Sequence, residues 1–209
     1  MEQGKIIFLN GISSSGKTTL VRALQDSLDG YYFHTSIDQF IETAPTKFHV
    51  SSDGQDPSTA DGLLWVFPHG SQQVSEIRIG FVGYRLIAGM YSAAAALASI
   101  GNDLIIDDVI FDRRVLQIAV RTLLPFHVLF VGVRCPLEIA EQRERERGDR
   151  MEGLARFQYP LVHSHGIYDF EVDTSILSST VCANQIRQRL QNGSAPNAFH
   201  ILQDTFATG

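Results

Sequence analysis

Apolar positions along the chain alternate between short continuous runs and longer stretches with helical spacing. The continuous runs are typical of strands buried on both faces of a sheet, and they cover residues 5–10, 31–37, 103–107, 126–134 and 168–173. Stretches in which apolar side chains recur every three or four positions predict helices over residues 17–28, 76–100, 112–123, 136–147, 151–165 and 178–191. The alternation predicts a doubly wound α/β fold with a parallel five-stranded sheet flanked by helices.

One segment interrupts this pattern in what is otherwise predicted as a single domain over residues 1–209. Residues 44–75 contain three prolines, three glycines and the only tryptophan of the chain, Trp65. A loop of this length in a compact domain is usually functional or poorly ordered, and the run from Leu63 to Phe67 is too apolar to remain in water. Two interpretations stay open: a loop held to the body by a small apolar cluster, or an insertion that forms one wall of an acceptor-binding pocket.

Composition and charge narrow the possible partners. Hydrophobic residues make up 44% of the chain and charged residues 19%, which is typical of a globular protein. The formal net charge of -6 argues against nonspecific binding to nucleic acid or to an anionic membrane surface. The apolar run from Met90 to Ile100 is shorter than the roughly 20 residues that cross a bilayer, so we expect a buried helix end there. We therefore expect no membrane partner, and the sequence leaves the oligomeric state open.

The two cysteines, Cys135 and Cys182, favour a reduced, cytoplasmic setting. They are too few for a disulfide framework, and neither belongs to a paired spacing that would hold zinc. His163 and His165 lie two positions apart, but no further histidine or cysteine joins them at a zinc-like spacing, so we expect a helix-end or packing role. His34, inside an apolar strand run, is expected to be a hydrogen-bonded core residue.

A phosphate-binding motif follows the first predicted strand. Gly11, Gly16, Lys17 and Thr18 match the pattern of glycine, four free positions, glycine, lysine, then serine or threonine. The glycines let the backbone turn, so that successive amide groups and the start of the next helix point at phosphate oxygens. Lys17 would bridge the terminal phosphates and Thr18 would ligate magnesium. The residues expected to contact ATP are Gly11, Ser13, Ser14, Ser15, Gly16, Lys17, Thr18 and Thr19.

Carboxylates at two further strand ends complete a candidate kinase site. Asp107 and Asp108 follow a buried strand run, and one of them is expected to reach the Mg²⁺ shell, although the sequence does not decide which. Asp38 follows the second run, and the carboxyl ends of parallel strands share one edge of the sheet. There Asp38 could accept the proton of an acceptor hydroxyl, and it could also cap the next helix.

An arginine-rich stretch suggests a lid over residues 143–153. On a helix Arg143, Arg147 and Arg150 share one face, and Gly148 lets the helix end or bend. A solvated charged helix is the ordinary explanation of such a run. Beside a phosphate loop, the interpretation we favour is a lid that closes over the triphosphate and stabilises charge in the transition state.

These motifs together resemble the chloramphenicol phosphotransferase family of P-loop kinases. The stretches that carry the resemblance are NGISSSGKT, SIDQF, LIIDDV, VGVRC, RERGDR and HSHGIYDFEVDT, in this order, over about residues 5–189. The resemblance implies a nucleoside-kinase-like fold and ATP-dependent phosphorylation of a hydroxyl on a small molecule, with Asp38 as the catalytic base. It also implies lid roles for Arg143, Arg147 and Arg150, and a nucleotide-binding role for Arg134.

The acceptor is less well determined than the reaction class. In residues 46–75 the chain departs from the family pattern beyond the letters APTKF, and this is where acceptor contacts are expected. A chloramphenicol-like antibiotic, another alcohol and a nucleotide sugar are all compatible with the motifs. A nucleotide-hydrolysing switch acting on a macromolecule would explain only the loop and the metal aspartate, and the chain lacks the NKxD motif that reads guanine. The sequence therefore favours a kinase.

Overall fold

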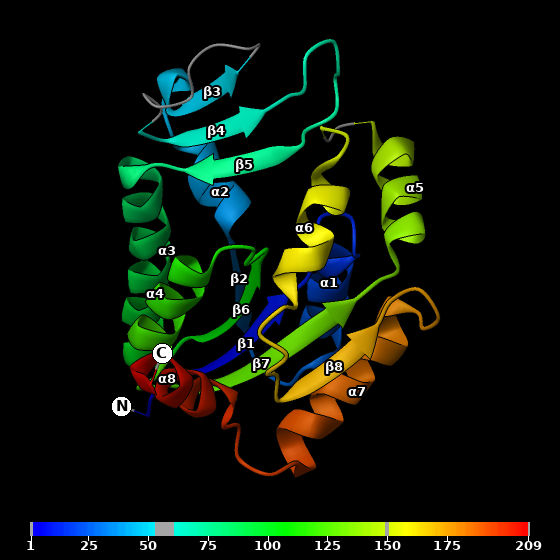
Figure 1. Ribbon diagram of the computed structural model, residues 1–209. Coiled ribbons are helices and arrows are strands. Elements are labelled where there is room, and N and C mark those ends of the chain that lie inside the picture. Colours follow the sequence, from blue (N-terminus) through cyan, green and yellow to red (C-terminus); the bar gives the residue numbers. More distant parts are fainter. Residues whose placement is uncertain (1, 53–60, 149–150, 209) are drawn as a thin grey trace.

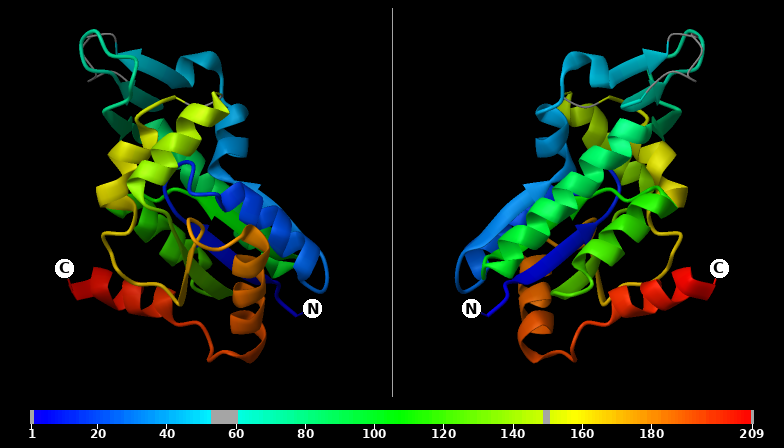
Figure 2. Two further views of the ribbon diagram at one scale, coloured as in Figure 1. Left: turned by 90° about the vertical axis from the view of Figure 1, so that its right-hand side faces the viewer. Right: turned by 90° about the vertical axis from the view of Figure 1, so that its left-hand side faces the viewer.

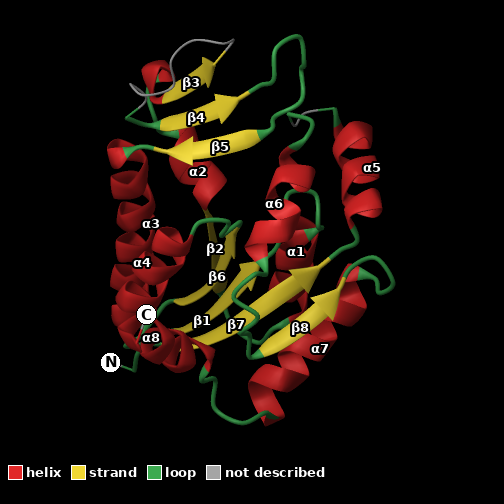
Figure 3. Ribbon diagram, in the orientation of Figure 1, coloured by secondary structure: helices red, strands yellow, loops and turns green. Residues whose placement is uncertain are grey.

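A parallel five-stranded sheet forms the centre of the molecule (Figures 1 and 3). The computed structural model describes residues 2–52, 61–148 and 151–208. The strand order is β2-β6-β1-β7-β8. The strands span Tyr32–Ser36 (β2), Asp103–Asp108 (β6), Lys5–Asn10 (β1), His127–Arg134 (β7) and Phe170–Asp173 (β8). All five predicted strand runs are therefore present, and the predicted doubly wound α/β fold is confirmed.

Alternation of side chains along β1 explains why both faces of the sheet are covered. Ile6 and Phe8 point into one apolar cluster, whereas Ile7 and Leu9 point into the other, and all four are fully buried. The first cluster is closed by α3 (Phe81–Ser99), α4 (Arg113–Leu123) and α8 (Ala198–Thr208). The second is closed by α1 (Lys17–Ser27) and α7 (Ser179–Asn192).

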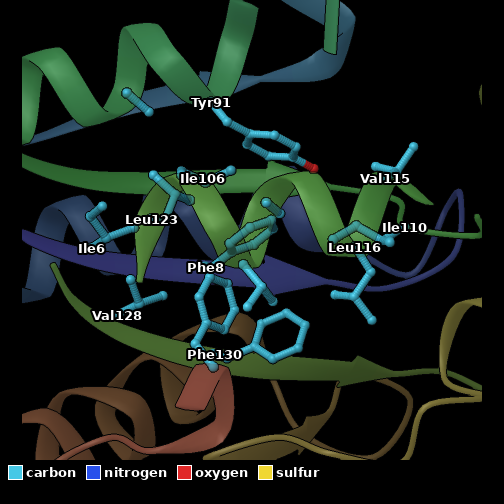
Figure 4. Packing of buried hydrophobic residues seen from close by; sticks show 14 of the residues in the cluster. Ile6, Phe8, Tyr91, Ile106, Ile110, Val115, Leu116, Leu123, Val128 and Phe130 are labelled. Atoms are coloured by element: carbon cyan, nitrogen blue, oxygen red, sulfur yellow. The ribbon is translucent and has the colours of Figure 1, made fainter. Parts of the chain in front are cut away.

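Aromatic packing fills the first cluster at its centre (Figure 4). The Phe8 ring lies 5.4 Å from the Phe130 ring and 5.9 Å from the Tyr91 ring, measured between centroids. Tyr91 is fully buried on α3, and its hydroxyl reaches the Asp108 carboxylate at the end of β6. The core packing therefore places one functional strand end directly against helix α3.

Three short helices and a second sheet lie at the carboxyl ends of the central strands (Figure 2). The helices are α2 (Ile37–Glu42), α5 (Leu137–Arg147) and α6 (Leu154–Val162). After the 3-10 turn η1 (Thr46–Phe48), the second sheet has the order β3-β4-β5, with strands His49–Ser52, Leu63–Val66 and Glu76–Ile79. Because parallel sheets carry their sites at this edge, the added elements enclose the functional end of the fold.

The structure corrects the predicted boundaries at three places. Residues 76–79 do not begin the predicted helix over 76–100; they form β5, which pairs antiparallel with β4, and the helix starts only after Gly80. The predicted helix over 151–165 is shorter, covering Leu154–Val162. Segment 44–75 was expected to be a loop, but its described part supplies strands β3 and β4. Cross-strand pairing outweighs local helical spacing here.

Helix α3 is long and apolar enough to cross a membrane by length and composition alone, and it is the single such helix in the described residues. In the structure it packs on the central sheet, with Ile87, Met90, Tyr91 and Ala94 among its buried residues. The core helix of a globular domain meets the same length and composition test, so this feature is weak evidence for a membrane span.

Candidate active site

The phosphate loop is a tight turn between β1 and α1. Ser14 and Gly16 both adopt the left-handed conformation, with φ of 58° and 89°. At Gly11 an added Cβ would lie 2.6 Å from the Val133 carbonyl oxygen, so only glycine lets the loop pass this close to β7. The sequence places glycines at the positions where the backbone needs them. The loop therefore leads into the N-terminus of α1, where backbone N–H groups face outward.

The loop offers unpaired polar groups where a polyanion would bind. The Ser14 and Ser15 hydroxyl oxygens are buried without a hydrogen-bond partner among the described residues. Lys17 is buried, and its Nζ donates to the carbonyl oxygens of Gly11 and Ile12 at 3.0 and 2.9 Å. Orphaned buried polar atoms are uncommon, and a phosphate ligand would satisfy them. The residues present therefore fit the triphosphate group of a nucleoside triphosphate.

Asp107 lies beside the loop and faces Thr18. The Thr18 hydroxyl donates to Asp107 Oδ2 at 3.1 Å, and Lys17 Nζ lies 3.9 Å from Oδ1. His34 Nε2 lies 3.8 Å from Oδ2, which makes it a close neighbour rather than a firm hydrogen-bond partner. Burial alone would raise the pKa of the Asp107 carboxyl, but His34, Lys17 and the Thr18 hydroxyl lower it below its ordinary value. Asp107 is therefore an anion next to Thr18.

The neighbouring Asp108 has a different environment. It accepts hydrogen bonds from the Tyr91 hydroxyl and, at 2.7 Å, from the Val109 N–H. Burial raises its pKa to about 6, against the lowering effect of those hydrogen bonds. The sequence left open which of Asp107 and Asp108 serves the metal, and the geometry favours Asp107 because its carboxylate faces Thr18.

Asp38 lies in the first turn of α2 at the same edge of the sheet. The N-cap of this helix is Ser36, which forms a capping box with Gln39: the Ser36 hydroxyl accepts from Gln39 N–H at 3.4 Å, and Gln39 Oε1 accepts from Ser36 N–H at 3.0 Å. Since the cap is Ser36, Asp38 is not needed for that purpose. Asp38 is exposed and lines the same cavity as Lys17 and Thr18.

A cavity of about 860 Å³ joins the phosphate loop to the second sheet. Its loop end includes Ser13, Ser14, Gly16, Lys17, Thr18 and Thr19, together with both aspartates of β6. Its far wall is formed mainly by apolar side chains of the second sheet: Leu63, Trp65, Ile77 and Ile79, with Phe67 beyond β4. The Trp65 ring packs 5.3 Å from the His49 ring. The structure thus places Leu63, Trp65 and Phe67 of segment 44–75 in the wall of this cavity, and the prediction that the cavity binds the acceptor stays a prediction.

The predicted lid arginines Arg143 and Arg147 lie in different places relative to the cavity and the phosphate loop. Arg147 lines the cavity. Arg143 donates from Nη2 to the Thr174 carbonyl oxygen at 2.8 Å, and Thr174 Oγ1 in turn bonds to the Ser15 carbonyl. Arg143 is therefore held close to the phosphate loop, next to Gly16. Arg150 lies outside the described residues, so its lid role stays a prediction.

Arg134 is directed away from the cavity. Its guanidinium forms an ion pair with Glu171 on β8 and lies 5.7 Å from the centre of the Tyr168 ring. It does not line the cavity that contains the phosphate loop. The nucleotide contact by Arg134 that the family resemblance implies stays a prediction.

The ends of the predicted lid segment have defined backbone geometry. Helix α5 ends at Gly148, which has φ of 63°, and this confirms the predicted helix end. Gly153, with φ of 93°, precedes α6. The buried carboxylate of Glu144 accepts hydrogen bonds from the N–H groups of Gly153 and Ala155 at 2.9 and 3.1 Å. Glu144 therefore fastens α5 to the start of α6.

Sequence reasoning missed two residues near the loop. His34 was expected in the core, yet it lines the cavity beside Asp107. Gln158 on α6 is buried, and its Oε1 accepts a hydrogen bond from the Ser13 N–H at 2.7 Å. A glutamine within a predicted helix carries no motif signal, so only the tertiary packing of α6 against the loop reveals it.

His163 and His165 have the packing role that the sequence predicted. His163 Nδ1 lies 2.7 Å from the Tyr168 hydroxyl, and this hydroxyl accepts a hydrogen bond from Asn10 Nδ2 at 2.8 Å. The His165 ring stacks on Phe130 with a centroid distance of 5.5 Å. These contacts connect the end of β1 with the segment after α6.

The free energy of unfolding is expected to fall as the pH is lowered from 6.5 to about 4. Burial lowers the pKa of His163 and of His165 to about 4, so each ring stays neutral in the folded state while the unfolded chain takes up protons. Each ring contributes up to about 1.4 kcal/mol per pH unit to the dependence of the unfolding free energy on pH, with the largest effect near the middle of this window. The raised pKa of Asp108 opposes this dependence below about pH 6. Urea unfolding of His165→Phe, measured at several pH values, should show a dependence of the unfolding free energy on pH that is weaker by about the contribution of one ring. An unchanged dependence would contradict the assignment.

The five-stranded parallel sheet and the phosphate loop together define a P-loop kinase-like fold. Among solved structures, the chain is similar to the APS kinase CysC of Mycobacterium tuberculosis in complex with AMPPNP and APS, with a TM-score of 0.62, 14% identity, and coverage of 92% of this chain and 100% of that chain. It is also similar to shikimate kinase from Acinetobacter baumannii in complex with shikimate, with a TM-score of 0.54, 16% identity, and coverage of 90% and 94%. At these identities the likeness shows the fold alone.

Sequence similarity defines the family. The family model of chloramphenicol phosphotransferase-like proteins matches residues 4–191. Two Mycobacterium tuberculosis proteins, from strains CDC 1551 and H37Rv, are each named "Putative O-phosphotransferase" and are 33% identical over 213 residues, covering 99% of this chain and 91% of the relative. The chain therefore belongs to the chloramphenicol phosphotransferase-like family, a phosphotransferase family, and the resemblance seen in the sequence is confirmed.

Proposed function

We propose that the protein transfers the γ-phosphate of ATP to a hydroxyl group of a small molecule. The observation that carries this proposal is that one cavity is lined by both the phosphate loop and Asp38 and has an apolar far wall. A nucleotide at the loop would present its terminal phosphate to the same space that the acceptor enters. Such proximity and orientation are the main contribution that a kinase makes to the reaction.

The residues around the loop would bind and orient the nucleotide. Backbone N–H groups of the loop and the N-terminus of α1 would cradle the phosphates, and the Ser14 and Ser15 hydroxyls would gain the partners that they lack. The Lys17 ammonium, now on the Gly11 and Ile12 carbonyls, would move to the terminal phosphates. Arg147, on the cavity wall, would stabilise negative charge that develops during transfer.

Asp38 would act on the acceptor. As the acceptor oxygen forms its bond to the γ-phosphorus, the bond from that phosphorus to the bridging oxygen breaks and ADP leaves with the electron pair. The hydroxyl proton passes to the Asp38 carboxylate. Asp38 is exposed and lines the cavity, so it belongs to the space that the acceptor would enter. The atoms and charges balance with no further reactant.

Thr18 and Asp107 would hold Mg²⁺ if the nucleotide binds as its magnesium complex. Within the described residues no group of three or more histidine, cysteine or acidic side chains could hold a metal ion by itself. This suits Mg²⁺, which commonly uses one or two carboxylates, waters and substrate phosphates. When bound there, the ion would neutralise phosphate charge. The lowered pKa of Asp107 keeps its carboxylate available for this role.

Asparagine substitutions should separate the two aspartates. Asp107→Asn is expected to raise the Mg²⁺ concentration needed for half-maximal nucleotide binding by about 10-fold or more, because it removes the charge beside Thr18. Asp108→Asn should change this value less, because that carboxylate faces Tyr91 and the Val109 N–H. Calorimetric titration of nucleotide at several Mg²⁺ concentrations measures both effects. The reverse order would assign the ion to Asp108.

The acceptor that we propose is a chloramphenicol-like antibiotic or a related alcohol with an apolar body. Family membership supports this class, and so does the far wall of the cavity, where Trp65, Phe67 and Ile77 would contact apolar surface. Because Trp65 is the only tryptophan of the chain, its fluorescence would report acceptor binding directly.

A panel assay tests the proposed function. ADP release from Mg-ATP would be followed in the presence of chloramphenicol and other antibiotic alcohols, nucleosides, and nucleotide sugars. We expect one apolar alcohol to raise turnover well above basal hydrolysis and to change Trp65 fluorescence. Stimulation by a protein partner alone would instead support a nucleotide-dependent switch, and stimulation by a nucleotide sugar alone would reassign the acceptor.

A further inference from the structure

A buried glutamine from α6 contacts the phosphate loop. Gln158 is 5% exposed, and its side-chain oxygen Oε1 accepts a hydrogen bond from the Ser13 N–H at 2.7 Å. The two residues are 145 positions apart in the sequence. Gln158 therefore brings a side chain from the segment after α5 to the centre of the loop.

This hydrogen bond fixes which way the amide group points. A backbone N–H can only donate, so the atom that meets Ser13 must be the amide oxygen and not the nitrogen. The nitrogen Nε2 then occupies the other arm of the amide. Nε2 has no hydrogen-bond partner among the described residues. It is absent from the set of described polar atoms that are both unpaired and fully buried, so it keeps some exposed surface. Since Gln158 lines the cavity, Nε2 is a donor that is accessible from it.

The surroundings of Nε2 indicate what it can bind. Nε2 and Oε1 belong to the same amide group, so Nε2 lies beside the loop residue that Oε1 holds. The bonded neighbour Ser13 belongs to the phosphate loop itself. An oxygen of a bound phosphate is therefore the acceptor that this position best provides. A neutral amide donor suits that oxygen without adding a buried charge.

We propose that Gln158 hydrogen-bonds from Nε2 to an oxygen of the transferring phosphoryl group while its Oε1 holds the Ser13 N–H. The proposal rests on the proposed function and extends it, because it adds a direct contact to the phosphoryl group from α6. It also explains why a polar side chain is buried at this point of α6. No bond is made or broken by Gln158.

The test compares two nucleotides in variants with the same charge change. Gln158→Glu keeps an oxygen acceptor for Ser13 but replaces the donor with an oxygen that repels phosphate. By calorimetry we expect this variant to bind a non-hydrolysable ATP analogue at least 10-fold more weakly than wild type, with a much smaller loss for ADP. Gln188→Glu, exposed on α7 and outside the cavity, should bind both nucleotides as wild type does.

Equal weakening of both nucleotides in Gln158→Glu would overturn the proposal, because Gln158 would then act only on the shape of the loop. Unchanged affinity for both would overturn it as well. If the wild-type protein binds neither nucleotide, the proposed function itself fails. A second measurement avoids dependence on variant folding: in wild-type protein labelled with ¹⁵N-glutamine, the Gln158 side-chain amide resonance should shift with the ATP analogue more than with ADP, and an equal shift would contradict the contact.

Discussion

Replacing Asp38 with asparagine is expected to lower acceptor phosphorylation by about 10²- to 10⁴-fold, the usual contribution of a general base. Asparagine keeps the size of the side chain but cannot take the proton of the acceptor hydroxyl. Helix α2 should remain folded, because its cap is formed by Ser36 and Gln39 and not by Asp38. Steady-state kinetics with the stimulating acceptor measures the effect, and nucleotide affinity should stay close to that of wild type.

The control for this variant is Asp26→Asn. Asp26 is exposed on α1 and does not line the cavity, so the same chemical change there should leave kcat and KM unaltered. If Asp38→Asn retains most of the wild-type kcat, Asp38 is not the base. Loss of nucleotide binding in Asp38→Asn would also contradict the assignment, since the residue would then belong to the nucleotide site.

Replacing Lys17 with alanine should affect both nucleotide binding and transfer. The Lys17 ammonium lies against the loop carbonyls and 3.9 Å from Asp107, so it is a buried cation of the loop that can move to the terminal phosphates. Removing one preorganised charged donor typically lowers kcat by about 10²- to 10³-fold. We expect a loss of this size in transfer, together with weaker ATP binding by calorimetry.

Lys5→Ala is the matched control, because Lys5 is exposed at the other end of β1. Lys17 also bonds two loop carbonyls, so thermal unfolding of Lys17→Ala must be recorded beside the kinetics. A folded Lys17→Ala protein with wild-type affinity and turnover would show that the loop does not bind phosphate. A folded variant that loses transfer but keeps its melting temperature would support the account.

Features whose residues are contiguous in the chain could be predicted from the sequence. The strand, glycine-rich turn and helix over residues 5–27 are continuous in the chain, so the motif and its context can be read together. The same holds for Gly148, whose left-handed conformation ends α5. Asp38 could be placed at the functional edge because strands of a parallel sheet share one carboxyl end.

Features that depend on long-range packing could not be predicted. Residues 76–79 share the helical spacing of residues 81–99, but pairing with β4 makes them a strand. Asp107 and Asp108 are adjacent, and consecutive residues of a strand face opposite sides, so only the placement of α1 and α3 shows which carboxylate meets Thr18. Gln158 reaches Ser13 across the fold, with no pattern in the sequence that joins them.

The central claim is that the γ-phosphate moves from ATP at the loop to an acceptor oxygen in the adjoining cavity. The most direct test is ³¹P NMR of the reaction with each compound of the panel, because it identifies the phosphorus product and not only the ADP. We predict that a phosphomonoester resonance of the acceptor appears in step with ADP and is absent with Asp38→Asn. Inorganic phosphate as the sole new product with every acceptor, at the same rate as without one, would contradict the account.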